Sequence, residues 1–199
     1  MTHHVGIFVF DQVEALDFAG PYEVFTTATR VHGRMHPTTI APFTTFSVAA
    51  THEPVQARAG LRLLPDHACD DHPPIDVLIM PGGVVDAECA KPEVLAWLRA
   101  CAARARIVAS VCTGALLLAE AGLLDGRTAT THWEDLGALR AYPHVDVRAD
   151  ARWVDEGSIV TSAGISAGID MSLHLVERVA GRVLAERTAR QMDYRWTEA

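Results

Sequence analysis

Short apolar runs alternate with longer segments of helical periodicity along the whole chain, and this alternation restricts the fold more than any other feature. Three runs have few polar interruptions: Val5–Phe10, Val77–Met80 and Arg106–Val111. Strands of a parallel sheet have this composition because helices cover both of their faces. Between the runs, Phe18–Ala28 and Pro92–Arg104 have helical spacing. The pattern predicts an α/β fold with a doubly wound, mostly parallel sheet and helices on both faces.

The remaining predicted elements continue this order. They are a strand at Phe43–Ala50, a half-exposed hairpin at Val55–Leu64, a strand near Thr128–Thr131, a helix near Trp133–Tyr142, two strands flanking Glu156-Gly157, a helix through Ile169–Ala180 and a last helix to about Tyr194. No repeat, low-complexity tract or linker interrupts the chain. We therefore expect residues 1–199 to form a single domain.

Length and charge exclude several classes of protein. A chain of 199 residues suits one α/β domain and is short for two. The net charge of −8 argues against nucleic acid as a partner. No apolar run approaches the roughly 18 residues that a membrane span needs, and the N-terminus lacks the pattern of a signal peptide. These features predict a cytoplasmic protein that does not bind membranes, with its four cysteines as free thiols.

One cysteine stands where an apolar strand gives way to an apolar helix. Cys112 follows the strand Arg106–Val111 and precedes the Ala/Leu-rich segment Thr113–Ala121. A sharp turn there would aim its side chain along a helix N-terminus, where unpaired N–H groups and the helix dipole favour the thiolate. This placement predicts a nucleophile whose pKa is lowered. The alternative is an inert core cysteine, which is the usual fate of a free cysteine.

A nucleophile at such a turn needs backbone N–H groups to stabilise developing negative charge. One donor normally comes from the following residue, here Thr113. The second is expected from Gly82, Gly83 and Val84, which leave the strand Val77–Met80 at the carboxyl edge of the sheet, where α/β folds bind ligands. The alternative is that this glycine pair forms only a turn.

The candidate carboxylic acid is Asp17, which follows the first strand near the same edge of the sheet. Leu16 and Phe18 would desolvate it, and burial raises the pKa of a carboxyl group. A protonated acid beside a sulfur can later deliver its proton. The alternative is a helix N-cap, a role that aspartate favours. Glu14 and Glu23 fall on positions that we expect to be exposed.

His132 is the candidate base, since it lies 20 residues after Cys112 at the end of a strand that we expect to neighbour the cysteine strand. It could deprotonate the thiol or form a wall of the pocket. The small residues of Thr161–Asp170 suggest tight packing, because the segment lacks the lysine of a phosphate-binding loop. No histidine spacing matches a metal site, so we expect no metal.

Together these segments resemble the ThiJ/PfpI superfamily over nearly the whole chain. The resemblance rests on Asp17 followed by Gly20-Pro21, the loop Met80–Gly83, and the strings SVCTGALLLAEAGLL, GRTATTHW and TSAGISAGIDMSLHLVE. It implies the flavodoxin-like sheet shared with class I glutamine amidotransferases, with a nucleophile elbow at Cys112. It also groups Gly20 and Ile165 with the predicted pocket.

Within the superfamily the chain is similar to the isocyanide hydratase branch. Peptidase members have a histidine after the nucleophile where this chain has Thr113, and deglycase members have a glutamate where it has Asp17. The resemblance implies a cofactor-independent hydratase acting on a small electrophile, as a homodimer. The alternatives are a glyoxalase or deglycase acting on 2-oxoaldehydes, with Asp17 as base and His132 assisting, and a cysteine-based redox or small-molecule sensor.

Regulators of the AraC type share this domain, and the chain offers no length for their helix-turn-helix domain of about 100 residues. The first helix gives a separate hint of assembly. Its apolar residues Phe18, Tyr22, Val24 and Phe25 surround more of the helix than one buried stripe requires. We therefore expect this helix to contribute to a homodimer interface.

Overall fold

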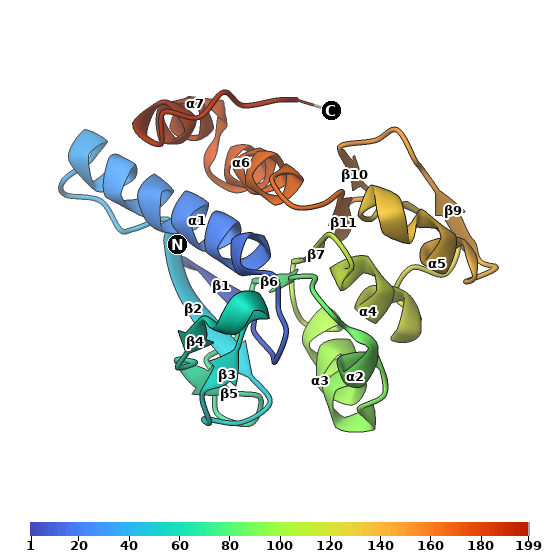
Figure 1. Ribbon diagram of the computed structural model, residues 1–199. Helices are drawn as coiled ribbons and strands as arrows, with labels where there is room; N and C mark the ends of the chain where they lie inside the picture. Colours follow the sequence, from blue (N-terminus) through green and yellow to red (C-terminus); the bar gives the residue numbers. More distant parts are fainter. Residues whose placement is uncertain (199) are drawn as a thin grey trace.

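A seven-stranded sheet forms the centre of the computed structural model, which describes residues 1–198 (Figure 1). Its strands, in spatial order, are β10 (Trp153–Asp155), β11 (Ile159–Ser162), β7 (Ile107–Val111), β6 (Val77–Met80), β1 (His3–Phe8), β2 (Phe43–Ala49) and β5 (His67–Ala68). All neighbours are parallel except β10 and β11. The strands β6, β7 and β11 are buried at every position, which explains the nearly unbroken apolar character of β6 and β7.

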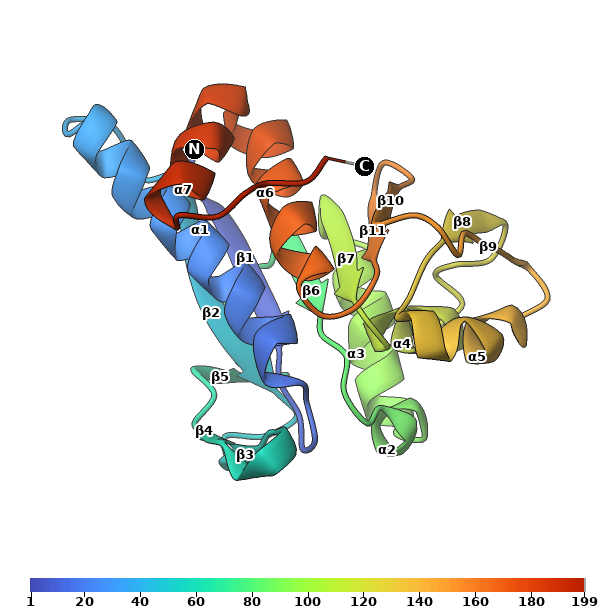
Figure 2. The same cartoon turned by 45° about the horizontal axis from the view of Figure 1, so that its top comes forward.

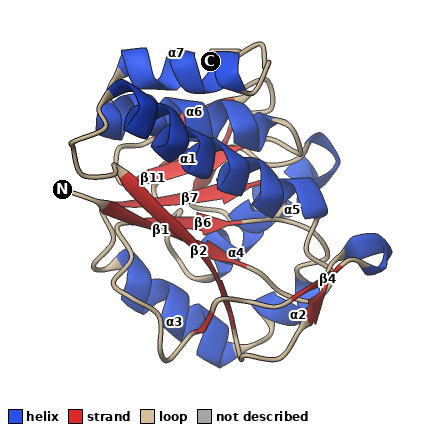
Figure 3. Cartoon of the chain, turned by 90° about the vertical axis from the view of Figure 1, so that its left-hand side faces the viewer, coloured by secondary structure: helices blue, strands red, loops and turns tan. Residues whose placement is uncertain are grey.

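Helices cover both faces of this sheet, as Figure 3 shows edge-on. One face carries α1 (Ala15–Met35), α6 (Ala167–Ala180) and α7 (Arg182–Gln191), with α7 packed on α1 and α6 (Figure 2). The other face carries α2 (Asp86–Cys89), α3 (Pro92–Ala102), α4 (Gly114–Glu120) and α5 (Leu136–Arg140). Two apolar clusters, one on each face, form the core. The predicted α/β fold with a mostly parallel sheet is confirmed.

Smaller elements extend from this framework. The strands β3 (Val55–Gln56) and β4 (Arg62–Leu63) form the hairpin predicted at Val55–Leu64, with a short 3-10 turn at Arg58–Gly60 between them. A second turn of this kind, Trp133–Asp135, precedes α5. The hairpin predicted around Glu156-Gly157 is formed by β10 and β11. No helix in residues 1–198 combines the length and apolar character of a membrane span.

The first helix is longer than predicted and begins earlier. It starts at Ala15, with Glu14 at the N-cap position, and continues to Met35. Asp17 therefore lies inside the first turn, and the prediction that it is the N-cap of a helix starting at Phe18 is wrong. The extension buries Val31 beyond the predicted end, so packing prolongs the helix where the sequence pattern alone does not.

The predicted position of the strand before His132 is also wrong. That strand, β8 (Arg127–Ala129), pairs with β9 (Val145–Val147) in a separate small sheet. The place beside β7 is taken by β11, which is fully buried and pairs with β7 in parallel. The chain after β8 nevertheless reaches the elbow, because the Thr131 hydroxyl donates a hydrogen bond of 2.8 Å to the Cys112 carbonyl.

Candidate active site

Cys112 occupies a sharp turn between β7 and α4 at the carboxyl edge of the sheet. Its φ is +56°, a backbone region that residues other than glycine rarely adopt. The turn depends on Gly114, because a Cβ at this position would collide with the Met80 carbonyl. The Cys112 side chain is 7% exposed and faces a pocket of about 260 Å³. The structure therefore has the nucleophile elbow that the sequence predicts.

Asp17 lies fully buried in the first turn of α1, next to this cysteine. Its Oδ2 accepts a hydrogen bond of 3.1 Å from the Gly82 N–H, whereas its Oδ1 has no hydrogen-bond partner among residues 1–198. Burial raises the pKa of the Asp17 carboxyl to about 7, against the lowering effect of the Gly82 N–H. The negative charge of Glu14 raises it further. Asp17 can therefore gain or lose a proton near neutral pH.

The pKa of Cys112 moves in the opposite direction from the prediction. Burial and the charge of Asp17 raise the pKa of the Cys112 thiol to about 12, although the N–H and hydroxyl of Thr113 lower it. A helix N-terminus favours the thiolate, but here the desolvation of the sulfur and the nearby carboxylate outweigh it. At neutral pH the sulfur is thus a thiol beside a carboxyl group that can accept its proton.

The loop after β6 holds these groups in place with its N–H groups. The Gly82 N–H binds Asp17, the Gly83 N–H donates to Thr113 Oγ1 at 2.8 Å, and the Val84 N–H donates to the Gln12 carbonyl at 3.1 Å. The hydroxyl of Thr113 also donates to the Gly83 carbonyl at 2.9 Å. All three N–H groups have hydrogen-bond partners within the protein, and their role in stabilising an oxyanion stays a prediction. In this arrangement the loop positions Asp17 and Thr113.

Two glycines make this close arrangement possible. A Cβ at Gly82 would lie 2.5 Å from Thr113 Oγ1 and 2.9 Å from Asp17 Oδ2. Gly83 has a φ of +139° and forms a bridge with Val13, where a Cβ would collide with the backbone. Only glycine lets this loop approach the start of α1 so closely.

His132 lies at the side of the pocket, where it can serve either as a base or as a wall. Its Nδ1 is 3.4 Å from Asp135 Oδ2 and 3.7 Å from Glu134 Oε2. Gly164 lies between the imidazole and the cysteine. A Cβ on this glycine would lie 2.2 Å from His132 Cδ2 and 3.1 Å from Cys112 Sγ. The ring is therefore close to the sulfur, and its Nδ1 accepts a hydrogen bond of 3.4 Å from the Glu134 N–H.

Not every predicted pocket residue lines the pocket. Ile165 does, and it is 36% exposed, but Gly20 lies inside α1 against Ile169 of α6, where its missing side chain lets the two helices approach. Val84 is exposed on the outside of the loop. Of the predicted set, the residues that line the pocket are Cys112, Thr113, Gly83, His132 and Ile165.

The sequence did not indicate the charged residues around the pocket. Glu14, which we expected to be exposed, lines it and pairs with Arg58 at 3.2 Å. Arg58 comes from the turn between β3 and β4, far from any motif, and nothing in its surroundings along the chain marks it. Glu134 and Asp135 complete the lining. Within residues 1–198, His, Cys, Asp and Glu form no group of three or more that could hold a metal ion.

The comparison with known families agrees with this geometry. The profile of the DJ-1/PfpI family matches residues 3–178. The chain belongs to the DJ-1/PfpI family. An isonitrile hydratase from Pseudomonas putida is 36% identical to this DJ-1/PfpI protein over 198 residues, which cover 98% of the chain and 79% of the relative. The resemblance to the ThiJ/PfpI superfamily is thereby confirmed.

Other relatives of this DJ-1/PfpI protein include a transcriptional regulator and two proteins of known structure. The transcriptional regulator GbdR from Pseudomonas aeruginosa is 31% identical over 96% of the chain, which spans only 50% of that regulator's length. Among solved structures, a ThiJ/PfpI family protein from Pseudomonas syringae has a TM-score of 0.86 and 29% identity, covering 100% of this chain and 77% of the other. DJ-1β from Drosophila melanogaster has a TM-score of 0.83 at 19% identity, with 98% and 100% covered, and shows the shared fold alone.

Proposed function

We propose that this protein is an isocyanide hydratase-like enzyme that converts an isocyanide and water into an N-formamide. The observation that supports it best is the buried pair of Cys112 and Asp17 beside the pocket, in which the pKa of the carboxyl group is raised to about 7. A nucleophile that must lose and regain a proton works best beside a group that titrates near the working pH. The isonitrile hydratase relative supports the substrate class. No cofactor is needed, because the carbon of an isocyanide is already electrophilic.

In the first step the Cys112 sulfur forms a bond to the terminal carbon of the isocyanide. The ionised Asp17 accepts the thiol proton as the bond forms and then delivers it to the same carbon, which gives a thioimidate. The Thr113 N–H, which already lowers the pKa of the thiol, stabilises negative charge on the sulfur during the attack. The sum of this step is the addition of the S–H bond to the isocyanide carbon.

In the second step a water molecule attacks the thioimidate carbon. Asp17 takes one proton from the water and passes it to the substrate nitrogen, which gives a tetrahedral adduct with a new hydroxyl group. It then takes the proton of this hydroxyl as the bond between carbon and sulfur breaks, and passes it to the sulfur. The N-formamide leaves, and Cys112 regains its proton. Asp17 ends the cycle ionised, as it began, so one water is consumed for each isocyanide.

The two alternative functions make different use of the same residues. A glyoxalase or deglycase would use Asp17 as base on a 2-oxoaldehyde, and the closeness of His132 to Cys112 is the observation that favours it. A redox sensor needs a thiolate of low pKa. The raised pKa of Cys112 argues against the sensor.

A panel of small electrophiles tests the proposed function and the effect of the pocket's charge together. Three carboxylates line the pocket, from Glu14, Glu134 and Asp135, against the one guanidinium of Arg58. We therefore expect saturable hydration of neutral and cationic alkyl isocyanides, with kcat/KM at least about tenfold lower for an anionic isocyanide such as isocyanoacetate. Formamide production is followed by chromatography. The difference should shrink as ionic strength rises.

Two variants show whether the pocket sets this preference. Glu134→Gln should raise the relative rate of the anionic isocyanide, whereas Glu93→Gln, an exposed change in the first turn of α3, should leave it unchanged. Turnover of methylglyoxal without any turnover of isocyanides would refute the hydratase and favour the glyoxalase. Hydration with no dependence on substrate charge would refute only the role of the carboxylates.

We also propose that the protein works as a homodimer built on α1. Of the residues on which this expectation rested, Val24 and Phe25 are fully buried within the chain, whereas Tyr22 is 40% exposed. Leu16 of the same helix is also 40% exposed, and Leu64 beside Tyr22 is 73% exposed. Leu64 and Tyr22 line one apolar hollow with Phe18. A second copy of the chain would remove these side chains from water and place its own residues near the start of α1, close to Asp17.

Light scattering of the wild-type protein at micromolar concentration should give about twice the chain mass of 21.5 kDa. Tyr22→Glu should shift the particle towards the monomer, because the dimer would bury the new charge. Ile40→Glu is the control, since Ile40 is an exposed apolar residue in the loop between α1 and β2. A fully active monomer in the wild-type protein would refute the dimer.

A further inference from the structure

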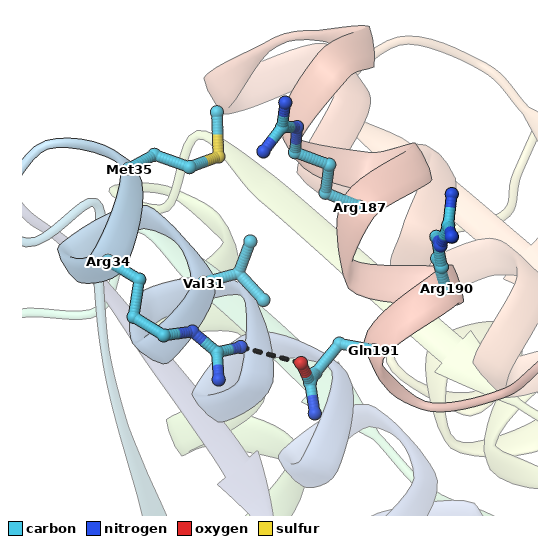
Figure 4. Close-up of a pocket in the computed structure, with 6 residues that line it drawn as sticks. All are labelled: Val31, Arg34, Met35, Arg187, Arg190 and Gln191. Carbon is cyan, nitrogen blue, oxygen red and sulfur yellow. Dashed lines mark hydrogen bonds between the residues drawn. The ribbon is translucent and has the colours of Figure 1, made fainter.

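A second hollow lies between the ends of α1 and α7, on the side of the molecule away from Cys112. It has a volume of about 450 Å³, within the usual range of ligand pockets. Figure 4 shows Arg34 and Met35 on one wall and Arg187, Arg190 and Gln191 on the other. Arg34 lies 17 residues after Asp17 on the same helix, about 25 Å along its axis, so this α1–α7 hollow is separate from the candidate active site.

Within the part of the chain that the structure describes, three arginines without a carboxylate partner line the α1–α7 hollow, and their guanidinium groups point in different directions (Figure 4). Arg34 donates a hydrogen bond of 2.7 Å to Gln191, which joins the two walls, but its charge is not compensated. Among residues 1–198, the ion pairs of arginine involve other positions. The gathering is unusual in a chain with a net charge of −8. Three positive charges around one hollow attract an anion to it.

A structural role at helix ends does not account for all three arginines. Arg34 and Arg190 lie in the last turns of their helices, where a positive charge compensates the helix dipole. Arg187 lies one turn earlier on the same face of α7 as Arg190, where it adds repulsion and gains little from the dipole. The helix dipole therefore gives little reason for an arginine at position 187.

We propose that the α1–α7 hollow binds a small organic phosphate. The guanidinium groups of Arg34, Arg187 and Arg190 would hold the phosphate oxygens, since planar guanidinium groups match phosphate geometry. The buried Val31 and the half-buried Met35 provide an apolar surface for the organic part of the ligand. The volume exceeds that of a bare phosphate, and this favours a phosphate ester over inorganic phosphate.

Calorimetric titration of the full chain with phenyl phosphate and with inorganic phosphate tests this proposal, at an ionic strength held constant with chloride. We expect one saturable site per chain, with phenyl phosphate bound more tightly. Arg187→Gln and Arg190→Gln should each weaken binding at least about fivefold. The matched control is Arg140→Gln, an exposed arginine in the last turn of α5, which should bind as the wild type does. Melting in the presence of each phosphate provides a second measurement.

The location of binding is checked with two further proteins. Cys112→Ala should bind phenyl phosphate with the wild-type affinity, because the pocket that Cys112 lines is distant from the α1–α7 hollow. Met35→Gln should weaken phenyl phosphate more than inorganic phosphate. An equal loss in Arg140→Gln would assign the binding to general charge, and a loss in Cys112→Ala would assign it to the other pocket. Either result, or the absence of both saturable heat and a melting shift, would overturn the proposal.

Discussion

In a Cys112→Ala variant we expect isocyanide hydration to fall to the uncatalysed level, a loss of at least about 10³-fold. The proposed reaction passes through a bond between the substrate and this sulfur, and among residues 1–198 no other thiol lines the pocket. The fold should survive, because alanine keeps the Cβ and the elbow is held by Gly114 and by the hydrogen bond from Thr131. Initial rates measure the loss of turnover, and circular dichroism measures whether the fold is kept.

Cys89→Ala is the matched control for this variant. Cys89 is a half-buried free thiol at the end of α2, and burial raises its pKa to about 11, close to that of Cys112. It lies outside the pocket, so turnover should stay near the wild-type level. A Cys112→Ala variant that kept a tenth of the activity, or a Cys89→Ala variant that lost it, would contradict covalent catalysis by Cys112.

Asp17→Asn should reduce turnover nearly as strongly, at least about 10²-fold, while its side chain still accepts the Gly82 hydrogen bond. In the wild type, kcat/KM should rise with pH through about 7, as the pair of Cys112 and Asp17 loses its first proton. The second proton belongs to a group whose pKa is raised to about 12, so activity should stay level to pH 9. The rise should be absent in Asp17→Asn, whose side chain does not titrate in this range.

The same variant should change stability in a way that depends on pH. Between about pH 4 and 7 the Asp17 carboxyl is protonated in the folded state and ionised in the unfolded state, because its pKa is raised from 3.8 to about 7. Folding then takes up a proton, so the free energy of unfolding of the wild type falls as pH rises through this window, by on the order of 4 kcal/mol. The amide of the Asp17→Asn variant does not titrate. Urea unfolding at pH 5 and 8 should show the variant gaining stability over the wild type at the higher pH.

A loss of stability in Asp17→Asn that is equal at both pH values, together with near-normal turnover, would show that Asp17 is a structural residue. Asp17→Ala separates the two contributions further. It removes the acceptor for the Gly82 N–H as well as the titrating group, and so should lose stability at pH 5 relative to Asp17→Asn.

The parts of the fold that the sequence could predict are those whose burial is visible in local composition. The strands β6 and β7 contain few polar residues because helices cover both faces, and the elbow at Cys112 follows from a strand meeting a helix without a linker. The pairing of β8 could not be predicted in this way. Its composition suits a strand in either sheet, and only the fully buried β11 decides which strand lies beside β7.

For the site, the sequence could predict which side chains lie near one another, but not the direction in which their surroundings shift the pKa of each. A position at a helix N-terminus was expected for Cys112. The direction of its pKa shift, however, depends first on how deeply the sulfur is buried and then on how closely Asp17 approaches, and tertiary packing sets both. Arg58 and Glu14 reach the pocket because the hairpin of β3 and β4 folds against the start of α1. That contact joins segments 44 residues apart and has no local signal.

The engagement of the Gly82–Val84 loop limits the reactions that this elbow can support. An ester or amide attacked at its carbonyl carbon develops a full negative charge on oxygen. The loop N–H groups that were expected to share this charge with the Thr113 N–H are bound to Asp17, Thr113 and Gln12. Addition to an isocyanide carbon places no such charge on an oxygen. The hydrogen bonds of this loop therefore disfavour ester and amide hydrolysis, which would require the Gly83 N–H to leave Thr113. The same change would free the side chain of Thr113, which is hydrogen-bonded to Cys112.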